Sequence, residues 1–428
     1  MSEQAVENSF YQRAEKILPA GGFGNFDPDV FITRAKGSHV WDQNGKRYID
    51  YLIGSGPMLV GHGHREVIEA VEDQIHKGMT YFANNPQGLA LAEEIGEAVA
   101  CADQVRFVST GGEADMYAMR LARAYTGRNK ILKFEGGYHG MSGEALMSLS
   151  PKRLVNFPQA VPDSAGIPDS VRDNMVIAPY NDIEFARQII AEYGDELACV
   201  IVEPLQRIIP PVAGFLETLR QETKKHGIVL IFDEVVTGFR LAYGGGQEAY
   251  GVTPDLCTLG KVIGGGFPLA AIAGSADIMA HFDKAKVGEE GFTMQVGTLS
   301  GNPVASVAGL KTMEILKRPG TYEGIAEKGK AIMTAISDNL NRVGIAHQIV
   351  GNPCLFDVIF SYNQIRDYRG IVAADTKIAK KYNFLMRKRG ILKADAKMYI
   401  STAHSDEDID KTIAAIKFAA DNLSTDGD

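Results

Sequence analysis

The chain has 428 residues, of which 45% are hydrophobic and 23% are charged. These proportions are typical of a globular protein with roughly two or three domains, and they exclude a disordered, collagenous or coiled-coil chain. The 44 basic and 53 acidic residues leave a net charge of -9. This charge argues against a general nucleic-acid or anionic-membrane binder, because both surfaces repel an anionic protein.

The location of the protein is indicated by what its sequence lacks. Residues 1–16 are polar and carry no basic start or apolar core of an export signal, so we expect a cytoplasmic protein. The longest uncharged stretch, residues 262–276, is rich in glycine and too short to span a bilayer, which needs about 20 apolar residues. The cysteines form no C-x-x-C pair, so we expect reduced, mostly buried thiols at Cys101, Cys199, Cys257 and Cys354.

The first part of the chain predicts a small antiparallel unit followed by a helix. Residues 38–41 and 47–50 flank Asn44 and Gly45, the dipeptide that best tolerates a tight hairpin turn. Residues 64–77 predict a helix with an apolar face directed at a sheet. The members of that face are Val67, Ile68, Val71 and Ile75.

From about residue 85, short apolar runs rich in β-branched residues alternate with helical stretches. The runs are residues 105–108, 130–133, 198–202, 227–232 and 256–259. Such alternation is typical of βαβ crossovers and predicts a mainly parallel sheet with helices on both faces.

Beyond residue 320 the composition changes. Residues 355–360 and 398–400 predict two further strands. The last helix is predicted to begin at the cap formed by Ser405 and Asp408. Its apolar face contains Ile409, Ile413 and Ile416.

The strand at 227–232 ends in Asp233, and the next apolar strand ends in Lys261. Side chains at the carboxyl ends of parallel strands line the crevice where open α/β sheets bind ligands. A lysine in such a crevice loses hydration, which lowers its pKa and frees the amine to form a Schiff base. An acid one strand away could keep a pyridine nitrogen protonated, so the pair suits pyridoxal phosphate. Taken singly, Asp233 could equally be a helix cap, and a lysine such as Lys261 is usually a surface ion-pair partner.

Two loops could complete such a site. The segment STGGEA at 109–114 joins a strand to a helix and would offer unpaired amides to a phosphate. It is neither a dinucleotide fingerprint nor a nucleoside-triphosphate loop, and a plain turn remains the alternative. The loop GGYHG at 136–140 presents Tyr138, a flat surface for an aromatic cofactor or an ordinary core residue.

The segments IFDEVVTGFR at 231–240 and TPDLCTLGKVIGGGFP at 253–268 resemble the signature of the class III pyridoxal-phosphate aminotransferases. The branch that they resemble most contains glutamate-1-semialdehyde aminomutase. Segments at 202–204, 297–303 and 401–408 extend the resemblance over nearly the whole chain.

The resemblance implies the α/β fold type I of pyridoxal-phosphate-dependent transferases. A large domain at 66–319 would hold a mainly parallel seven-stranded sheet and the cofactor. Residues 1–65 and 320–428, from the two termini, would form a small α+β domain.

The same resemblance implies roles for individual residues. Lys261 would form the Schiff base and move the substrate proton, and Asp233 would pair with the pyridine nitrogen. Val235 and Tyr138 would pack on opposite faces of the ring. Glu203 would be the acid that contacts the residues around the cofactor.

The phosphate would bind to Thr110, Gly111 and Gly112. Thr298 would reach the phosphate of a neighbouring subunit, so the family arrangement implies a homodimer with shared active sites.

Other candidates have weaker support. His62 and His64 lack acidic or cysteine partners at metal-binding spacing, so we expect a loop turn there and no metal site. Arg207 and Arg240 could clamp a substrate carboxylate or serve as structural ion pairs. His139 is expected to orient the loop that carries Tyr138. The aromatic residues that line either the substrate pocket or the core are Tyr81 and Phe82.

Two departures from the aminomutase affect the expected reaction. Residues 390–398 read GILKADAKM. The corresponding stretch of the aminomutase, which resembles SQFEA, is longer overall and contains a glutamate that is absent here. In addition, Gly112 stands where the family usually has a hydroxyl residue. We therefore expect an aminotransferase that moves an amino group between an amine or amino acid and a keto acid, ketone or aldehyde by a ping-pong mechanism. The alternatives are the aminomutase, a racemase, and a non-catalytic dimeric scaffold, which would have no need of Lys261 beside Asp233.

Overall fold

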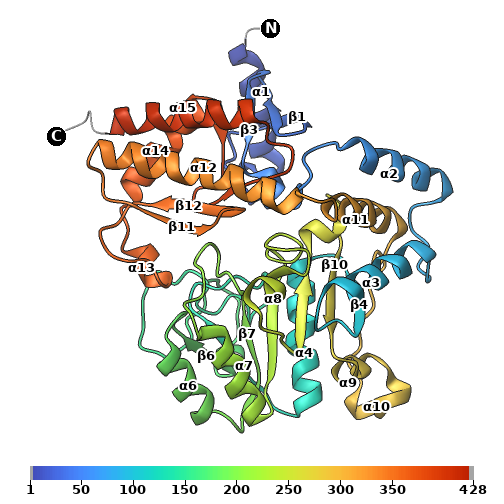
Figure 1. Cartoon of the computed structure of the whole chain (residues 1–428). Coiled ribbons are helices and arrows are strands. Elements are labelled where there is room, and N and C mark those ends of the chain that lie inside the picture. The colour runs from blue at the N-terminus through green and yellow to red at the C-terminus, as the bar shows by residue number, and fades with distance from the viewer. Residues whose placement is uncertain (1–2, 424–428) are drawn as a thin grey trace.

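Figure 1 shows the computed structural model of the chain, which describes residues 3–423. The central sheet has seven strands: β4 (Gln104–Val108), β5 (Lys130–Phe134), β6 (Met175–Ala178), β7 (Leu197–Val202), β8 (Val229–Glu234), β9 (Leu256–Leu259) and β10 (Ala270–Gly274). Their order across the sheet is β4-β10-β9-β8-β7-β5-β6. Only β10 runs antiparallel to its neighbours in this sheet, and the other pairings are parallel.

Helices cover both faces of this sheet. One face packs on α4 (Gly111–Thr126), and the other on α6 (Ile183–Glu192) and α7 (Phe215–His226). The remaining helices of this part are α5 (Asp169–Arg172), α8 (Gly245–Tyr250), α9 (Ala276–Met279) and α10 (Lys284–Gly291). A layer beside the sheet edge contains α2 (Arg65–Lys77), α3 (Pro86–Ala98) and α11 (Pro303–Leu316), with α11 packed against the other two. The α/β fold expected from the sequence is confirmed.

The alternation of side chains along β8 decides what the strand presents to each layer. Val229 and Ile231 belong to the core on the α4 side, whereas Leu230 and Phe232 belong to the core on the α7 side. Successive side chains of a strand point to opposite faces. Asp233 therefore lies on the α4 side.

The upper part of Figure 1 is built from both ends of the chain. A four-stranded sheet joins β1 (Ile32–Lys36), β2 (His39–Asp42) and β3 (Arg47–Asp50) to the C-terminal strand β13 (Ile391–Leu392). A three-stranded sheet contains β11 (Gln348–Asn352), β12 (Leu355–Ile359) and β14 (Met398–Tyr399). The helices here are α1 (Glu3–Ile17), α12 (Thr321–Arg342), α13 (Tyr368–Val372), α14 (Thr376–Lys388) and α15 (Asp406–Leu423). The domain boundaries at residues 65 and 319 stay a prediction.

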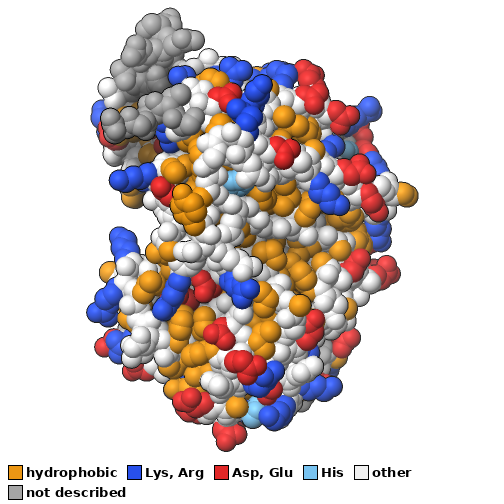
Figure 2. Space-filling view, turned by 60° about the vertical axis from the view of Figure 1, so that its left-hand side comes forward, with side chains coloured by type: hydrophobic (Ala, Val, Ile, Leu, Met, Phe, Trp, Pro, Cys, Tyr) orange, Lys and Arg blue, Asp and Glu red, His pale blue; other side chains and the backbone are white. Residues whose placement is uncertain are grey.

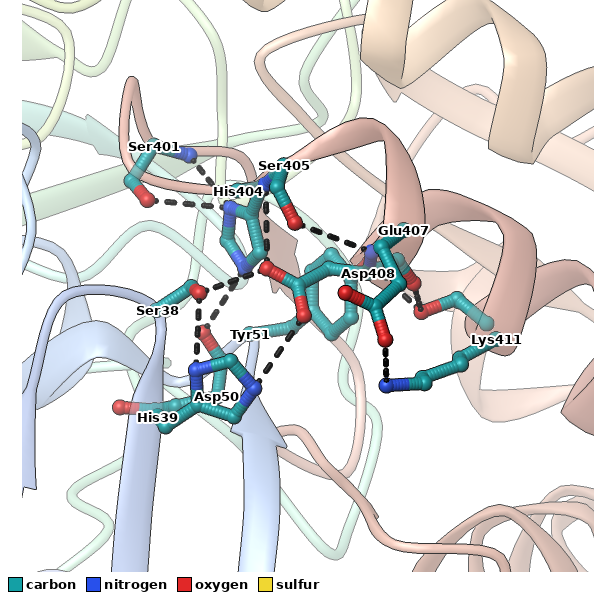
Figure 3. A network of polar contacts seen from close by, with 11 residues as sticks. Ser38, His39, Asp50, Tyr51, Ser401, His404, Ser405, Glu407, Asp408 and Lys411 are labelled. Carbon is teal, nitrogen blue, oxygen red and sulfur yellow. Dashed lines mark hydrogen bonds and ion pairs between the residues drawn. The ribbon is translucent and has the colours of Figure 1, made fainter.

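A buried polar network ties the N-terminal strands to the start of α15 (Figure 3). His404 accepts a hydrogen bond from the amide of Ser401 at Nδ1 (3.0 Å), and its Nε2 lies 3.1 Å from the carbonyl oxygen of Asp50. Its ring stacks on Tyr51 with centroids 4.4 Å apart. Asp408 accepts a hydrogen bond from the hydroxyl of Ser38 (2.7 Å). Hydrogen bonds and ring stacking thus hold residues 38–51 against residues 401–408, which lie far away in the sequence.

Several local predictions are confirmed. Asn44 and Gly45 form the turn between the antiparallel strands β2 and β3. At the start of α15, Ser405 and Asp408 exchange side-chain-to-backbone hydrogen bonds of 3.2 and 3.0 Å, the reciprocal cap that the sequence predicts. The buried face of that helix includes Ile409 and Ile416.

The stripe predicted for α2 is partly wrong. Val67 and Val71 are buried, but Ile68 and Ile75 are 43% and 44% exposed, and the polar Gln74 is buried instead. The amide nitrogen of Gln74 donates to the carbonyl oxygen of Gly78 and to the hydroxyl of Tyr81. Gln74 follows Val67 and Val71 at the i, i+4, i+7 spacing of one helix face, and local hydrogen bonds offset the cost of burying its polar side chain there.

The surface in Figure 2 intersperses acidic and basic side chains, and hydrophobic side chains gather between the upper and lower parts of this face. Among residues 3–423, no helix is long and apolar enough to cross a membrane. The expectation of buried, free thiols is confirmed for the cysteines at 101, 199, 257 and 354.

Candidate active site

Asp233 is held at the carboxyl end of β8 by two hydrogen bonds. Its Oδ2 lies 2.8 Å from Nδ1 of His139, and its Oδ1 accepts from the amide of Val235 at 3.0 Å. Asp233 and His139 are 4% and 1% exposed. His139 thus contacts the carboxylate directly, a more specific role than the expected orientation of the loop at 136–140.

Lys261 begins the short 3-10 helix Lys261–Gly264 directly after β9. Its backbone has φ of 50°, in the left-handed region that non-glycine residues seldom adopt and that is often found at functional sites. Burial lowers the pKa of the Lys261 ammonium, and the negative charges of Asp233 and Glu203 oppose that shift. The positive charges of Arg240 and Arg207 reinforce it. The neutral amine is therefore more available here than in water.

The start of α4, where the sequence predicts a phosphate site, has a capping box that uses some of its amides. Thr110 caps the helix by accepting from the amide of Glu113, and the Glu113 carboxylate accepts from the amides of Ser109 and Thr110 at 2.9 and 3.0 Å. Those two amides are therefore occupied. Gly111 and Gly112 stand at the first two helical positions, where amides have no partner within the helix. The phosphate is left with these amides and the Thr110 hydroxyl.

Close packing explains the glycines at the start of α4. A methyl group on Gly111 would lie 2.7 Å from a methyl group of Val235, so the half-buried Val235 packs against the start of α4. A methyl group on Gly112 would lie 3.1 Å from the Cα of Gly140, in the loop that carries Tyr138. The hydroxyl residue usual in the family would have to displace this loop. The close approach of two backbones thus accounts for Gly112.

Glu203 connects the loop of Tyr138 to the segment after β7. Its Oε2 accepts from the amide of Tyr138 at 2.9 Å, and its Oε1 accepts from the amide of Arg207 at 3.3 Å. The guanidinium of Arg207 lies 5.1 Å from the centre of the Tyr138 ring. A single carboxylate thus places an aromatic ring and an exposed cation beside each other.

Arg240 is a second cation near Lys261, and it is 1% exposed. Its Nη2 donates to the carbonyl oxygen of Gly56, and its guanidinium lies 4.9 Å from the ring of Tyr399. Within the described part of the chain, Nε and Nη1 of Arg240 have no hydrogen-bond partner. This buried guanidinium therefore has donors to spare for an anion.

Thr298 lies apart from these residues. It is exposed and lines a surface cleft of about 770 Å³ together with Phe82, Leu89 and Val296. Phe82 is 71% and Tyr81 43% exposed, so neither is core. His62, by contrast, is engaged locally, with Nε2 at 2.7 Å from Oδ2 of Asp50.

Two residues of the site were missed by the sequence analysis. Asp115 lies on the buried face of α4, and one of its carboxylate oxygens, a ring nitrogen of His139 and a carboxylate oxygen of Asp233 lie within 4.8 Å of one another. The sequence does contain a sign of Asp115, because this charged residue interrupts the apolar helical stripe of Ala114, Ala118 and Leu121. Lys397 had no such signal. Burial lowers the pKa of its ammonium, and Arg207, Lys261 and Arg240 act in the same direction.

Taken together, these residues fit a cofactor that carries an aldehyde, a basic ring nitrogen and a phosphate. A half-buried amine, a buried carboxylate and unpaired helix-start amides meet the three needs. The packing of Gly112 against Gly140 leaves no room for a side chain between the start of α4 and the loop at 136–140. The residues present are thus suited to pyridoxal phosphate.

Comparison with known proteins points the same way. Residues 24–416 match the model of the family described as Aminotransferase class-III. The chain is 40% identical to glutamate-1-semialdehyde 2,1-aminomutase of Desulforamulus reducens, with 97% of both chains covered. It is 41% identical to the enzyme of the same name from Neisseria gonorrhoeae, over 94% of this chain and 96% of that one.

Solved structures include an omega-transaminase from Sphaerobacter thermophilus with a TM-score of 0.92 and 33% identity, covering 98% of each chain. A glutamate-1-semialdehyde aminomutase from Pseudomonas aeruginosa has a TM-score of 0.88 at 21% identity, covering 98% of this chain and 96% of that one, and supports the fold alone.

Proposed function

The chain belongs to the class III aminotransferase family, whose cofactor is pyridoxal 5'-phosphate, and on this premise we propose that it moves an amino group at Lys261. The observation that carries the proposal is the half-buried Lys261 amine, which lies under the charge of the buried Asp233. When bound, the cofactor supplies the aldehyde that captures an amine and the ring that accepts electrons. A scaffold without catalysis would have no use for this costly arrangement.

The roles of the protein groups follow from their positions. Asp233, fixed by His139 and the Val235 amide, would hold a proton on the ring nitrogen. Lys261 Nζ, whose pKa is lowered by burial, would move the proton between the substrate carbon and the aldehyde carbon of the cofactor. Tyr138 would pack on the ring while Glu203 holds its backbone.

A substrate carboxylate fits the cations around Lys261. Arg207 is exposed beside Tyr138, and Arg240 keeps two unpartnered donors. Arginine binds a carboxylate with paired hydrogen bonds, so we assign substrate recognition to Arg207 and Arg240.

For the particular reaction, the relatives favour the aminomutase over the transaminase that the sequence analysis expected. The names of the curated relatives at 40% and 41% identity support the internal transfer within glutamate 1-semialdehyde. This is the first candidate.

Transamination is the second candidate, and the segment at 390–398 favours it. Within this segment Lys393 is buried in an ion pair with Asp357 (2.7 Å), which anchors the loop that carries Lys397. Lys397 adds an amine near Arg207 and Lys261, and an anionic keto acid bound beside it would favour its protonated form. A transaminase must release one product and admit such an acceptor.

The two candidates differ in what a single substrate does. For the aminomutase, the enzyme should convert glutamate 1-semialdehyde without an acceptor, and amino acids alone should leave the visible absorption of the bound cofactor unchanged. For the transaminase, an amino donor alone should bleach that absorption stoichiometrically, and pyruvate should restore it. Lys261→Ala is the control that should abolish both responses, and neither response in the intact enzyme would contradict amino-group transfer.

A homodimer with shared sites is part of the proposal. Thr298 lies outside the Lys261 cluster in a cleft rimmed by exposed apolar side chains, and such patches commonly mark protein interfaces. The rim includes Phe82 (71%), Leu89 (61%) and Val296 (64%). A second copy of the chain would cover it and receive the Thr298 hydroxyl at its phosphate.

Subunit exchange tests this arrangement. Mixing Lys261→Ala and Thr298→Ala protomers should produce heterodimers with one doubly altered site and one intact site. Activity above that of either parent is the expected result. A fully active monomer at low concentration would contradict the shared site.

A further inference from the structure

Asp115 brings a second carboxyl group to the site of Asp233. It lies on α4, is 2% exposed, and faces the end of the sheet. Thr258 on β9 is the direct cross-strand partner of Asp233 on β8, and its hydroxyl donates to Oδ1 of Asp115 at 2.6 Å. Asp115 is thus hydrogen-bonded to β9, and its carboxyl group lies within 4.8 Å of the Asp233 carboxylate on β8.

The two buried carboxyl groups cannot both be charged at low cost. Like charges at this separation in a poorly hydrated site force one proton to stay bound. Burial and the charges of Asp233 and Glu203 raise the pKa of Asp115 well above its usual value, and the Thr258 hydroxyl opposes this only in part. The other titratable groups that face Asp115 are His139 and Tyr138.

The surrounding hydrogen bonds decide which carboxyl group keeps the proton. Asp233 receives the His139 contact and the Val235 amide, and it also faces the positive charge of Lys261. Asp115 receives only the Thr258 hydroxyl in the described part of the chain. Donors and cations stabilise a carboxylate, so Asp233 is the anion.

We propose that Asp115 is a protonated carboxylic acid that donates a hydrogen bond to Asp233 and so limits the basicity of Asp233. With Oδ1 engaged by Thr258, Oδ2 carries the proton. A less basic Asp233 leaves the proton on the ring nitrogen of the cofactor rather than drawing it away, so Asp115 is a positioning residue for the proposed reaction. No covalent bond changes, and the Asp115 proton is not transferred.

The first experiment needs no cofactor. An infrared difference spectrum of the apo protein at neutral pH, wild type minus Asp115→Asn, should contain the carbonyl stretching band of a protonated carboxylic acid. A difference spectrum with carboxylate bands alone would overturn the proposal. This result is independent of whether the proposed function holds.

The second experiment uses the holoenzyme and follows the visible absorption, which reports the proton at Lys261 Nζ, as a function of pH. Asp115→Ala removes the donor and should raise the midpoint by roughly half a unit to one unit, because a hydrogen bond to a charged group is worth about one pKa unit or more and transmission through the ring weakens it. Asp115→Asn keeps a donor and should restore the wild-type midpoint. Thr258→Val removes the hydroxyl that contacts Oδ1 of Asp115 but leaves the Asp115 proton in place, so it should shift the midpoint less than Asp115→Ala does.

The direction of the shifts separates the alternatives. If Asp115 were an anion, both substitutions at 115 would remove a negative charge and lower the midpoint, which would refute the proposal. Unchanged midpoints in both variants would reduce Asp115 to a structural residue and refute it as well. If Asp115→Ala fails to fold, Asp115→Asn and the infrared spectrum still decide.

Discussion

Acidification should lower the free energy of unfolding through protonation of His404, and the pKa of this residue sets the size of the loss. Burial lowers the pKa of the His404 ring from 6.5 to about 4. Its contacts show which ring nitrogen carries the hydrogen. The amide of Ser401 can only donate, so Nδ1 must accept and Nε2 carries the hydrogen that faces the carbonyl oxygen of Asp50. A second proton would have to displace the Ser401 amide.

The sign follows from proton linkage. The folded pKa is lower than the unfolded one, so the unfolded chain binds the proton first and stability is lost as the pH falls through the interval from 6.5 to about 4. With these two pKa values, His404 accounts for a loss of about 2 kcal/mol between neutral pH and about pH 5, and about 3 kcal/mol below the folded pKa.

The assay compares urea unfolding midpoints of the wild type and His404→Gln near pH 7.5 and near pH 5. A glutamine can accept from Ser401 and donate to Asp50 but does not titrate, so the variant should lose about 2 kcal/mol less than the wild type over this range. The comparison isolates His404 from His39, whose pKa is also lowered by burial. His76→Gln, in the exposed last turn of α2, is the matched control and should behave as the wild type. Equal acid losses in the wild type and His404→Gln would refute the reasoning.

Further predictions concern the site. Lys261→Ala should prevent borohydride from fixing the cofactor covalently, and a reducible adduct in that variant would remove Lys261 from its role. Asp233→Asn should retain the cofactor but slow turnover by orders of magnitude, because a neutral amide no longer maintains the ring charge; near-normal turnover would count against Asp233. Gly140→Ala should weaken cofactor binding, measured by equilibrium dialysis, since a methyl group there would collide with the Cα of Gly112 and φ is 86°. Arg207→Gln should raise KM about tenfold or more for carboxylated substrates and spare amines without a carboxylate, as expected for a lost charged contact.

Much of the fold is local chemistry that can be predicted from the sequence. The capping pair Ser405 and Asp408 and the turn at Asn44 and Gly45 act over a few residues, so the tertiary structure did not alter them. Strand β10 was not predicted, because its run Ala-Ala-Ile-Ala-Gly has a single β-branched residue, Ile272, among residues of low strand propensity. Its pairing with two neighbours, not its own propensity, makes it a strand.

The sequence by itself determined that Asp233 and Lys261 share one edge of the sheet, because parallel strands bring their carboxyl ends together whatever surrounds them. Only the tertiary structure decided which groups act on this pair. Asp115 reaches Asp233 through helix packing, Lys397 comes from a loop far along the chain, and Glu113 occupies amides that the loop at 109–114 was expected to offer. The charge state of these groups depends on desolvation, neighbouring charges and hydrogen bonds that act over a few ångströms between segments remote in sequence. The hydrophobic periodicity of a single segment does not predict those distances.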